Sequence, residues 1–308
     1  MPARFAAALL YLMAKGLAAL PWPVLRRLAD AIAWAWRRLD ARESRVARRN
    51  LELAFPELLP SEREEMHAGV LRYTARQFLE TLRIWTRPAA ANLPMIREQH
   101  GAGLFDAAVA SGRGLIIAIP HYGNWELLNH WMVERTGICV LYRAPQSAVG
   151  DAFLRKARHC PGDRVTQVRA EGQGMRQLFT TLRDGGAVVI LPDQQPKSGD
   201  GVFAPFFGIP ALTMTLLSRL AHRTGAKVLF LWCERIGDDG TPAYSLHVEE
   251  APAEVSDEDP VAATTAINAT VERIARRAPT QYQWTYKRYT LRPSGRKQDN
   301  PYRDLERR

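Results

Sequence analysis

The chain reads LIIAIPHYGNWE at residues 115–126. An apolar run of this length, closed by Pro120, predicts a buried strand that ends in a tight loop. The residues from Leu127 to Arg135 have helical character and are followed by Gly137, and Asn124 stands where the N-cap of that helix is expected. The segment therefore predicts a strand, a loop and a helix in succession, which is a building unit of α/β proteins.

His121 and Glu126 lie five residues apart within this junction. On one continuous helix they would point about 140° apart, at about 100° per residue. They converge only if His121 lies in the loop and Glu126 in the first helical turn, where the helix dipole favours a carboxylate. An imidazole held by a carboxylate is a general base, so we expect His121 and Glu126 to form a catalytic dyad. The alternative is a polar loop residue beside a solvated helix residue.

Strand-like and helical segments alternate from residue 100 onward. This alternation predicts an α/β fold with a mixed or mostly parallel central sheet flanked by helices. A longer helix is predicted earlier in the chain, from the capping pattern at 61–64 to about residue 85. The further strand-like runs are 138–141, 187–191 and 227–232, and the helical segments are 125–135, 149–158, 174–183, 212–223 and 259–277.

Functional sites in open α/β sheets lie at the carboxyl ends of the strands. His121, Arg143 and Asp193 each follow a predicted strand, so we expect them to converge. Arg143 and Arg169 are candidates for binding a phosphate or stabilising developing negative charge, although each could simply pair with a surface acid. We count Asn124 and Asp193 as further substrate-binding candidates, and Asp193 chiefly as a residue that orients its loop.

The composition narrows the possible partners. The formal net charge is +10, which suits nucleic acid, anionic lipid or an acidic carrier protein. No segment resembles a nucleic-acid-binding module, so we expect no nucleic-acid partner. Three widely spaced cysteines suggest neither a disulfide framework nor a zinc site, and we expect no metal and no cofactor. A serine hydrolase is unsupported because the chain lacks a Gly-x-Ser-x-Gly motif.

The N-terminal 50 residues combine apolar and basic stretches. Phe5–Ala14 and Gly16–Leu25 are uncharged but separated by Lys15, and eight arginines follow between Arg26 and Arg49. A secure transmembrane helix needs about 20 unbroken apolar residues. We therefore predict a membrane-associated helical segment over 1–50, an α/β domain over 51–292 and a polar, basic tail over 293–308. An amphipathic helix packed on the domain is the alternative, and the sequence leaves open whether the segment spans or lies on the membrane.

The stretch PHYGNWELL at 120–128 resembles the His-x4-Asp/Glu motif of glycerolipid-type acyltransferases. It has the form found in the late acyltransferases of bacterial lipid A biosynthesis, and the resemblance extends over nearly the whole chain. Four blocks in the right order make this resemblance specific. The other blocks are RNL at 49–51 with AFPE at 54–57, LPDQQ at 191–195 with FAPFFG at 203–208 and PA at 210–211, and APTQYQW at 278–284 with KR at 287–288.

The resemblance implies an acyltransferase that moves a fatty acyl chain from an acyl carrier protein thioester to a hydroxyl of a lipid A precursor. His121, held by Glu126, would take the hydroxyl proton, with no covalent acyl-enzyme. It also implies a bacterial inner-membrane protein whose site faces the cytoplasm. Three alternatives remain open: acylation of another polar lipid, such as an aminolipid or glycolipid, a hydrolase that releases free fatty acid, and a non-catalytic membrane scaffold. The acyl chain length is not predicted.

Overall fold

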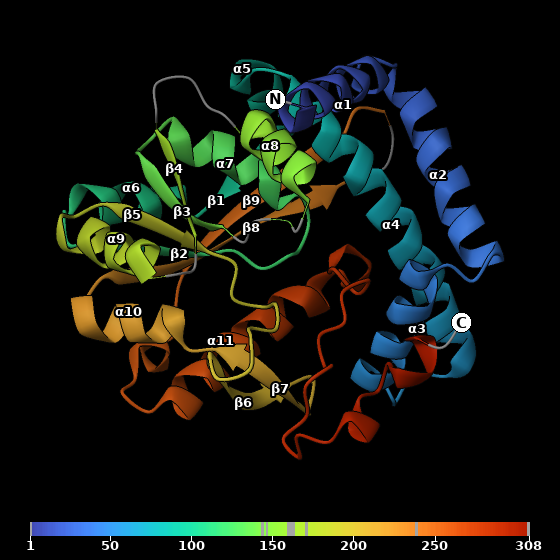
Figure 1. Cartoon of the computed structure of the whole chain (residues 1–308). Helices are drawn as coiled ribbons and strands as arrows, with labels where there is room; N and C mark the ends of the chain where they lie inside the picture. Colours follow the sequence, from blue (N-terminus) through green and yellow to red (C-terminus); the bar gives the residue numbers. More distant parts are fainter. Residues whose placement is uncertain are drawn as a thin grey trace.

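Seven strands form the central sheet of the computed structural model, in the order β1-β9-β8-β2-β5-β3-β4 (Figure 1). The structure describes residues 2–142, 145, 147–158, 164–169, 172–237 and 240–306. Neighbouring strands are parallel except β8 and β9, so the sheet is mostly parallel, as predicted. The strands are β1 (Ile96–His100), β2 (Leu115–Ala118), β3 (Ile138–Tyr142), β4 (Val165–Arg169), β5 (Ala187–Ile190), β8 (Lys227–Ile236) and β9 (Ala243–Glu250).

The centre of the sheet is buried on both faces. Ile117 of β2 lies opposite Val189 of β5 and Leu229 of β8. These three side chains pack into one apolar cluster, whereas Ile116 and Val188 pack into a second cluster on the other face. Because successive side chains of a strand point to opposite faces, a strand covered on both sides must be apolar throughout. This explains why residues 115–119 form an unbroken apolar run.

Helices cover both faces of the sheet (Figure 1). The cluster around Ile117 is closed by α6 (Ala102–Ala110) and α7 (Trp125–Val133). Three helices contribute to the cluster on the opposite face: α9 (Gly172–Arg183), α10 (Leu216–Thr224) and α11 (Pro260–Arg277). The remaining helices beyond the N-terminal region are α5 (Ala89–Asn92), α8 (Ala148–Ala157) and the 3₁₀ helices η1 (Leu93–Met95), η2 (Ala253–Ser256), η3 (Pro279–Gln281), η4 (Lys297–Asp299) and η5 (Arg303–Glu306).

The predicted strands at 115–119, 138–141, 187–191 and 227–232 are confirmed as β2, β3, β5 and β8. The helix predicted over 212–223 begins too early, because residues up to Met214 belong to a hairpin of β6 (Gly201–Phe206) and β7 (Ile209–Met214). Its two-residue turn, Phe207-Gly208, has positive φ at both positions (48° and 73°), the geometry that suits tight hairpins. Sequence periodicity missed this hairpin because each strand contains a proline, Pro205 or Pro210, and neither forms a continuous apolar run.

Four helices make up the N-terminal region: α1 (Pro2–Ala18), α2 (Trp22–Arg38), α3 (Arg42–Ala54) and α4 (Pro60–Thr86). The long helix α4 confirms the helix predicted near 61–85, and it contacts each of the other three. On α2, Leu25 and Ala29 are fully buried and therefore belong to the core. The predicted boundary at residue 50 falls inside α3, and the division of the chain at residues 50 and 292 stays a prediction.

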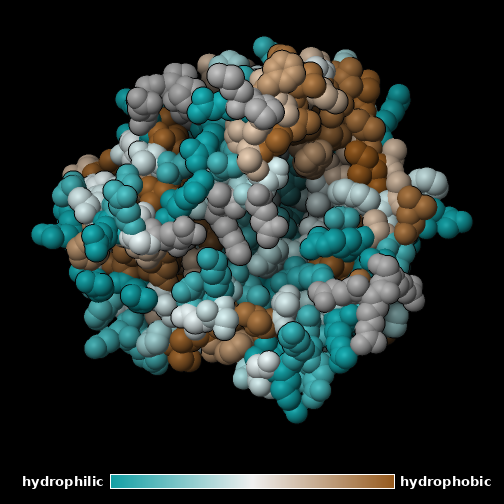
Figure 2. Space-filling model, viewed as in Figure 1, coloured by the Kyte–Doolittle hydropathy of each residue, from teal (hydrophilic) through white to brown (hydrophobic). Residues whose placement is uncertain are grey.

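Among the described residues, no single helix is long and apolar enough to cross a membrane. Residues 3–18 of α1 and 22–38 of α2 meet the criterion only as a pair, and they are bent by 111° at the break between them. Their outer side carries exposed large apolar side chains, visible as a brown area at the upper right of Figure 2. We call this set the apolar patch; its members are Phe5, Leu9, Leu10, Leu12, Met13, Leu20, Val24, Leu28 and Trp34.

The C-terminal segment returns to the N-terminal helices (Figure 1). Arg49 of α3 forms an ion pair with Asp304 at 2.9 Å. The side-chain amide of Asn50 donates to the carbonyl oxygens of Trp284 (2.6 Å) and Tyr286 (2.8 Å), and its oxygen accepts from the buried hydroxyl of Tyr302. The described part of the polar tail is therefore packed against α3.

Candidate active site

The loop after β2 is fixed from three sides. The backbone N–H of Gly123 donates to Gln281 O at 3.0 Å, and that of Asn124 donates to Cys233 O at 3.0 Å. The side chain of Gln77 on α4 donates to Gly123 O at 2.7 Å. Gly123 has φ of +59°, and a Cβ there would lie 1.8 Å from Cys233 O, so only glycine fits. The His121 loop is therefore a rigid support for its side chain.

His121 is paired with Asp193, which follows β5. The ring Nδ1 lies 2.7 Å from Oδ1 of Asp193, and the backbone N–H of His121 donates to Oδ2 at 2.8 Å. Burial alone would raise the pKa of Asp193, but the charge of His121 and these hydrogen bonds hold it below its ordinary value. Because an ionised carboxylate only accepts hydrogen bonds, the ring proton of neutral His121 belongs on Nδ1. The Nε2 atom then carries no proton, and its lone pair is the acceptor for a substrate proton.

The structure differs from the predicted pairing of His121 with Glu126. The carboxylate of Glu126 accepts from Trp85 Nε1 (3.0 Å) and Asn129 Nδ2 (3.2 Å), and it forms an ion pair with the guanidinium of Arg158. Burial lowers the pKa of Arg158, but the charge of Glu126 outweighs it and raises the pKa overall. The first turn of α7 directs Glu126 toward α4 and the end of α8, so the carboxylate that fixes the His121 ring is Asp193.

A cavity of ≈ 890 Å³ opens in front of His121 and Glu126. Its volume lies in the range of cavities that bind small molecules and cofactors. Its lining has one polar and one apolar part. The polar part contains His121, Glu126, Asn129, His130, Arg158, Arg169 and Gln194, and the apolar part contains Val140, Val165, Met175, Val189, Leu191, Met214 and Leu216. The base therefore stands where polar groups meet a surface that accepts an apolar chain.

The remaining predicted residues have different positions. Arg169 ends β4, lines the cavity and lies 3.6 Å from Asp151, so it is both a cavity residue and part of an ion pair. Asn124 precedes α7 but makes no capping hydrogen bond; its buried amide lies 3.4 Å from the hydroxyl of Tyr244 and does not line the cavity. Asp193 is buried and binds both the ring and the backbone N–H of His121. Arg143 lies outside the described residues.

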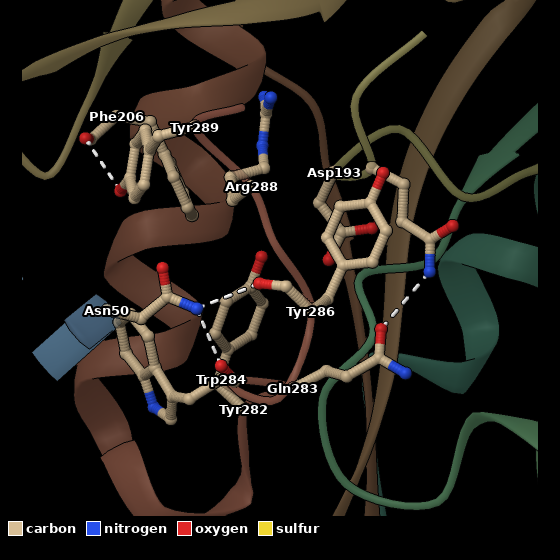
Figure 3. Close-up of a pocket in the computed structure, with 10 residues that line it drawn as sticks. Asn50, Asp193, Phe206, Tyr282, Gln283, Trp284, Tyr286, Arg288 and Tyr289 are labelled. Atoms are coloured by element: carbon tan, nitrogen blue, oxygen red, sulfur yellow. Dashed lines mark hydrogen bonds between the residues drawn. The ribbon is translucent and has the colours of Figure 1, made fainter. Parts of the chain in front are cut away.

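The C-terminal block supports the His121–Asp193 pair from behind (Figure 3). The backbone N–H of Gln283 donates to His121 O at 3.0 Å, and Tyr122 and Tyr282 form an isolated antiparallel bridge. Figure 3 shows Asp193, Tyr282 and Tyr286 around a cavity of ≈ 10 Å³. The sequence contained these residues in its APTQYQW block, but nothing in the pattern indicated that this block pairs with the His121 loop.

Sequence reasoning missed Arg158 as a member of the site, did not connect Trp85 with Glu126, and gave Gln194 no role beyond its place beside Asp193. Trp85 and Arg158 reach Glu126 from α4 and from the end of α8. Neither carries a motif, and their contacts bridge 41 and 32 residues of sequence. Gln194 had a usable signal, because it directly follows Asp193 at the carboxyl end of β5 and stands in the LPDQQ block.

A buried imidazole–carboxylate pair at the wall of a partly apolar cavity is typical of an enzyme that uses a general base on a partly apolar substrate. Comparison with known families narrows this class. The family model described as bacterial lipid A biosynthesis acyltransferase matches residues 1–290, so the chain belongs to this family and is an acyltransferase.

Curated relatives support the same assignment. The lipid A biosynthesis palmitoleoyltransferase of Escherichia coli K12 is 29% identical over 281 residues, which cover 90% of this chain and 88% of the relative. The lauroyltransferase of the same organism is 29% identical over 280 residues, with the same coverage. A phosphatidylinositol mannoside acyltransferase of Mycobacterium tuberculosis H37Rv is 31% identical over 138 residues, covering 43% of this chain and 42% of that protein.

Proposed function

We propose that this acyltransferase moves a fatty acyl chain from an acyl carrier protein thioester to a hydroxyl of a lipid A precursor. The observation that carries the proposal is the 2.7 Å contact of His121 Nδ1 with Asp193, which leaves Nε2 as a base at the cavity. Nε2 takes the hydroxyl proton while the oxygen attacks the thioester carbon. The thiolate of the carrier leaves and recovers the proton from Nε2, so no acyl-enzyme forms.

In this proposal Glu126 does not orient His121; it holds Arg158 at the cavity wall. Its carboxylate is 4% exposed and holds the guanidinium of Arg158 at the polar part of the cavity. A buried carboxylate is costly without a cation, so Glu126 and Arg158 stabilise each other. The pair places a positive group on the cavity wall, together with Arg169, where anionic groups of the substrates can bind.

The acidic carrier fits a basic surface on α9 and α10. Arg176 and Arg183 are exposed on α9, and Arg219 and Arg223 are exposed on α10. None of the four has an ion pair within the described part of the chain. Arg183 and Arg223 stack against Phe179 (5.9 and 5.1 Å to its centroid), and Arg219 reaches the cavity. Charge complementarity of this kind would guide an acidic carrier to the cavity mouth.

A lipid A precursor is the acceptor favoured by the two Escherichia coli relatives, whose names refer to lipid A biosynthesis. Another polar lipid is the second candidate, and a specific observation favours it. The mycobacterial relative is named for acylation of a phosphatidylinositol mannoside, although its similarity covers less than half of the chain. Both acceptors combine hydroxyl groups, a phosphate and apolar chains, which the cavity would accommodate.

The proposed location is the cytoplasmic face of the bacterial inner membrane. The apolar patch on α1 and α2 supports it, with Phe5 exposed to 76% and Trp34 to 69%. Electrostatic attraction between the N-terminal arginines and anionic lipid headgroups is weaker than the sequence implied. Arg37, Arg48 and Arg49 already form ion pairs with acidic side chains of the protein. We therefore propose that apolar insertion of the patch, more than the arginines, attaches the protein to the membrane.

A coupled assay tests the proposed function. Purified protein in detergent receives an acyl carrier protein thioester, with or without a lipid A precursor, and both released thiol and lipid mass are measured. The proposal predicts thiol release that requires the acceptor and a product heavier by one acyl group. Thiol release without an acceptor would indicate a hydrolase, and its absence under all conditions a scaffold. Transfer only to an aminolipid or a phosphatidylinositol mannoside would show that this lipid, and not a lipid A precursor, is the acceptor.

A further inference from the structure

The side-chain amide of Gln194 has two close partners. Its Nε2 lies 3.0 Å from Nε2 of His121 and donates to Oε1 of Gln283 at 3.1 Å. With the ring proton on Nδ1 facing Asp193, the Nε2 of His121 is an acceptor. One N–H of the Gln194 amide therefore points at the base and the other at Gln283. The lone pair that should receive a substrate proton is occupied by a protein donor.

The amide is held in this orientation from both ends. Gln283 is fixed by its backbone N–H, which donates to His121 O at 3.0 Å. Gln194 directly follows Asp193, which is tied to the ring and the backbone of His121. Gln194 and Gln283 both line the large cavity, so the amide lies where a substrate would meet the base. A donor fixed in advance at such a point costs little reorganisation during a reaction.

We infer that Gln194 is a further catalytic residue, which caps the base in the free enzyme and stabilises the oxyanion during acyl transfer. This inference rests on the proposed function. When the acceptor hydroxyl arrives, its O–H replaces the amide as the partner of Nε2. The Gln194 amide keeps its bond to Gln283, and its second N–H is then free to donate to a substrate oxygen.

The oxygen that needs this donor is the thioester carbonyl oxygen. The hydroxyl oxygen bonds to the carbonyl carbon as its proton moves to Nε2, and the carbonyl oxygen becomes an oxyanion. That oxygen is two bonds from the attacking oxygen, which itself lies within hydrogen-bond distance of Nε2. The amide nitrogen is 3.0 Å from the same Nε2, so it is within reach of the oxyanion. When the oxyanion collapses, the C–S bond breaks and the thiolate takes the proton from Nε2.

Three other side-chain donors on the cavity wall bind Glu126. Trp85 Nε1, Asn129 Nδ2 and Arg158 all donate to Glu126. The charged groups near His121 are Asp193 in direct contact and, on the cavity wall, Glu126, Arg158, Arg169, Lys197, Asp200 and Arg219. The ring of Trp125 packs edge-on against the imidazole at 4.8 Å, and the Gln194 amide is a neutral donor to its Nε2.

Kinetics of Gln194→Ala and Gln194→Met test this role, since both lack the N–H and Met keeps much of the volume. Loss of one oxyanion donor typically lowers kcat by about 10²–10³-fold. We expect that loss for both variants, with little change in KM. Gln99→Ala is the matched control. Gln99 lies on β1, accepts a hydrogen bond from Trp131 Nε1 of α7 and does not line the cavity, so this variant should retain wild-type kcat. Thermal melts of all proteins establish that they are folded.

The pH profile of kcat/KM separates capping from a merely structural role. An N–H that points at Nε2 opposes protonation there, so its removal should move the acidic limb to higher pH. Gln194→Glu should move it further, because a carboxylate attracts the protonated ring. Wild-type kcat in folded Gln194→Ala and Gln194→Met, or an acidic limb that stays in place, would overturn the inference. Neither result would affect the base itself, since loss of transfer in His121→Ala tests that separately.

Discussion

His121 Nδ1 and Asp193 Oδ1 lie 2.7 Å apart, although 72 residues separate them in the sequence. β2 and β5 are adjacent and parallel, so their carboxyl ends meet at one edge of the sheet. A second bond, from the His121 backbone N–H to Asp193 Oδ2, fixes the carboxylate relative to the loop as well as the ring. The orientation of the base therefore depends on the pairing of β2 with β5 at the centre of the sheet.

Replacement of Asp193 should leave the His121 side chain in place but stop it from acting as a base. In Asp193→Asn, the new amide can donate to Nδ1, which would place the ring proton on Nε2, facing the substrate. We expect acyl transfer to fall about 10²–10⁴-fold, the usual contribution of general-base catalysis. Steady-state kinetics check this. The double variant with His121→Ala should be no worse than His121→Ala alone, because the two residues act as a unit; additive losses would contradict the pairing.

The pair formed by Glu126 and Arg158 should behave as a second unit. Glu126→Gln weakens the hold on Arg158, so both Glu126→Gln and Arg158→Ala should reduce transfer, and the double variant should lose little more than either single one. A double-mutant cycle on the transfer rate measures this coupling. Arg155→Ala is a matched control, because Arg155 lies on the same helix but pairs with Asp151. Strong coupling of Glu126 with His121, and none with Arg158, would restore the dyad predicted from the sequence.

The sequence predicted more of the fold than of the site. Apolar runs identified the four central strands, because strands buried on both faces carry a strong local signal. β9 went unnoticed: it is an eight-residue strand that mixes polar and apolar residues. Sequence placed His121, Arg143 and Asp193 after predicted strands, but it could not reveal which carboxylate meets the ring. That choice depends on strand order and on the direction of Glu126, and both arise from tertiary packing rather than from local sequence.

Membrane attachment should depend on the apolar patch. The full-length protein should stay in the membrane pellet at 1 M salt, where charges are screened within about 3 Å, and should need detergent for release. A variant with Phe5, Leu12 and Met13 changed to Ser should be released by salt. Sedimentation followed by immunoblotting measures both. Leu59→Ser with Val261→Ser, at exposed positions outside the patch, should behave as wild type. Complete release of the wild-type protein by salt would exclude apolar insertion.

Stability should fall on mild acidification because of His247. This ring stacks between Trp232 (4.9 Å) and His100 (4.7 Å), and burial, with the charges of Arg277 and His100, lowers its pKa to about 4. Glu234 and Glu98 oppose this shift. Between pH 6.5 and 4, His247 is protonated in the unfolded chain but not in the folded protein. The free energy of unfolding therefore decreases as pH falls through this window.

Thermal melts of His247→Phe compared with wild type at pH 7.5 and pH 5 measure this contribution. Phe keeps the stacked ring but takes up no proton, so its Tm should fall less than that of the wild type between the two pH values. Groups that do not interact with His247 titrate equally in both proteins and cancel in the comparison. An identical decrease in both would show that the His247 ring is not the cause.

Acyl transfer by His121→Ala tests the central claim most directly. The protein is purified in detergent, its fold is verified by circular dichroism and thermal melting, and the transfer of acyl groups from carrier thioester to lipid acceptor is measured beside wild type. If Nε2 of His121 is the general base, the variant should retain the fold and lose at least about 100-fold in rate. A folded His121→Ala protein with a near-wild-type transfer rate would contradict the mechanism.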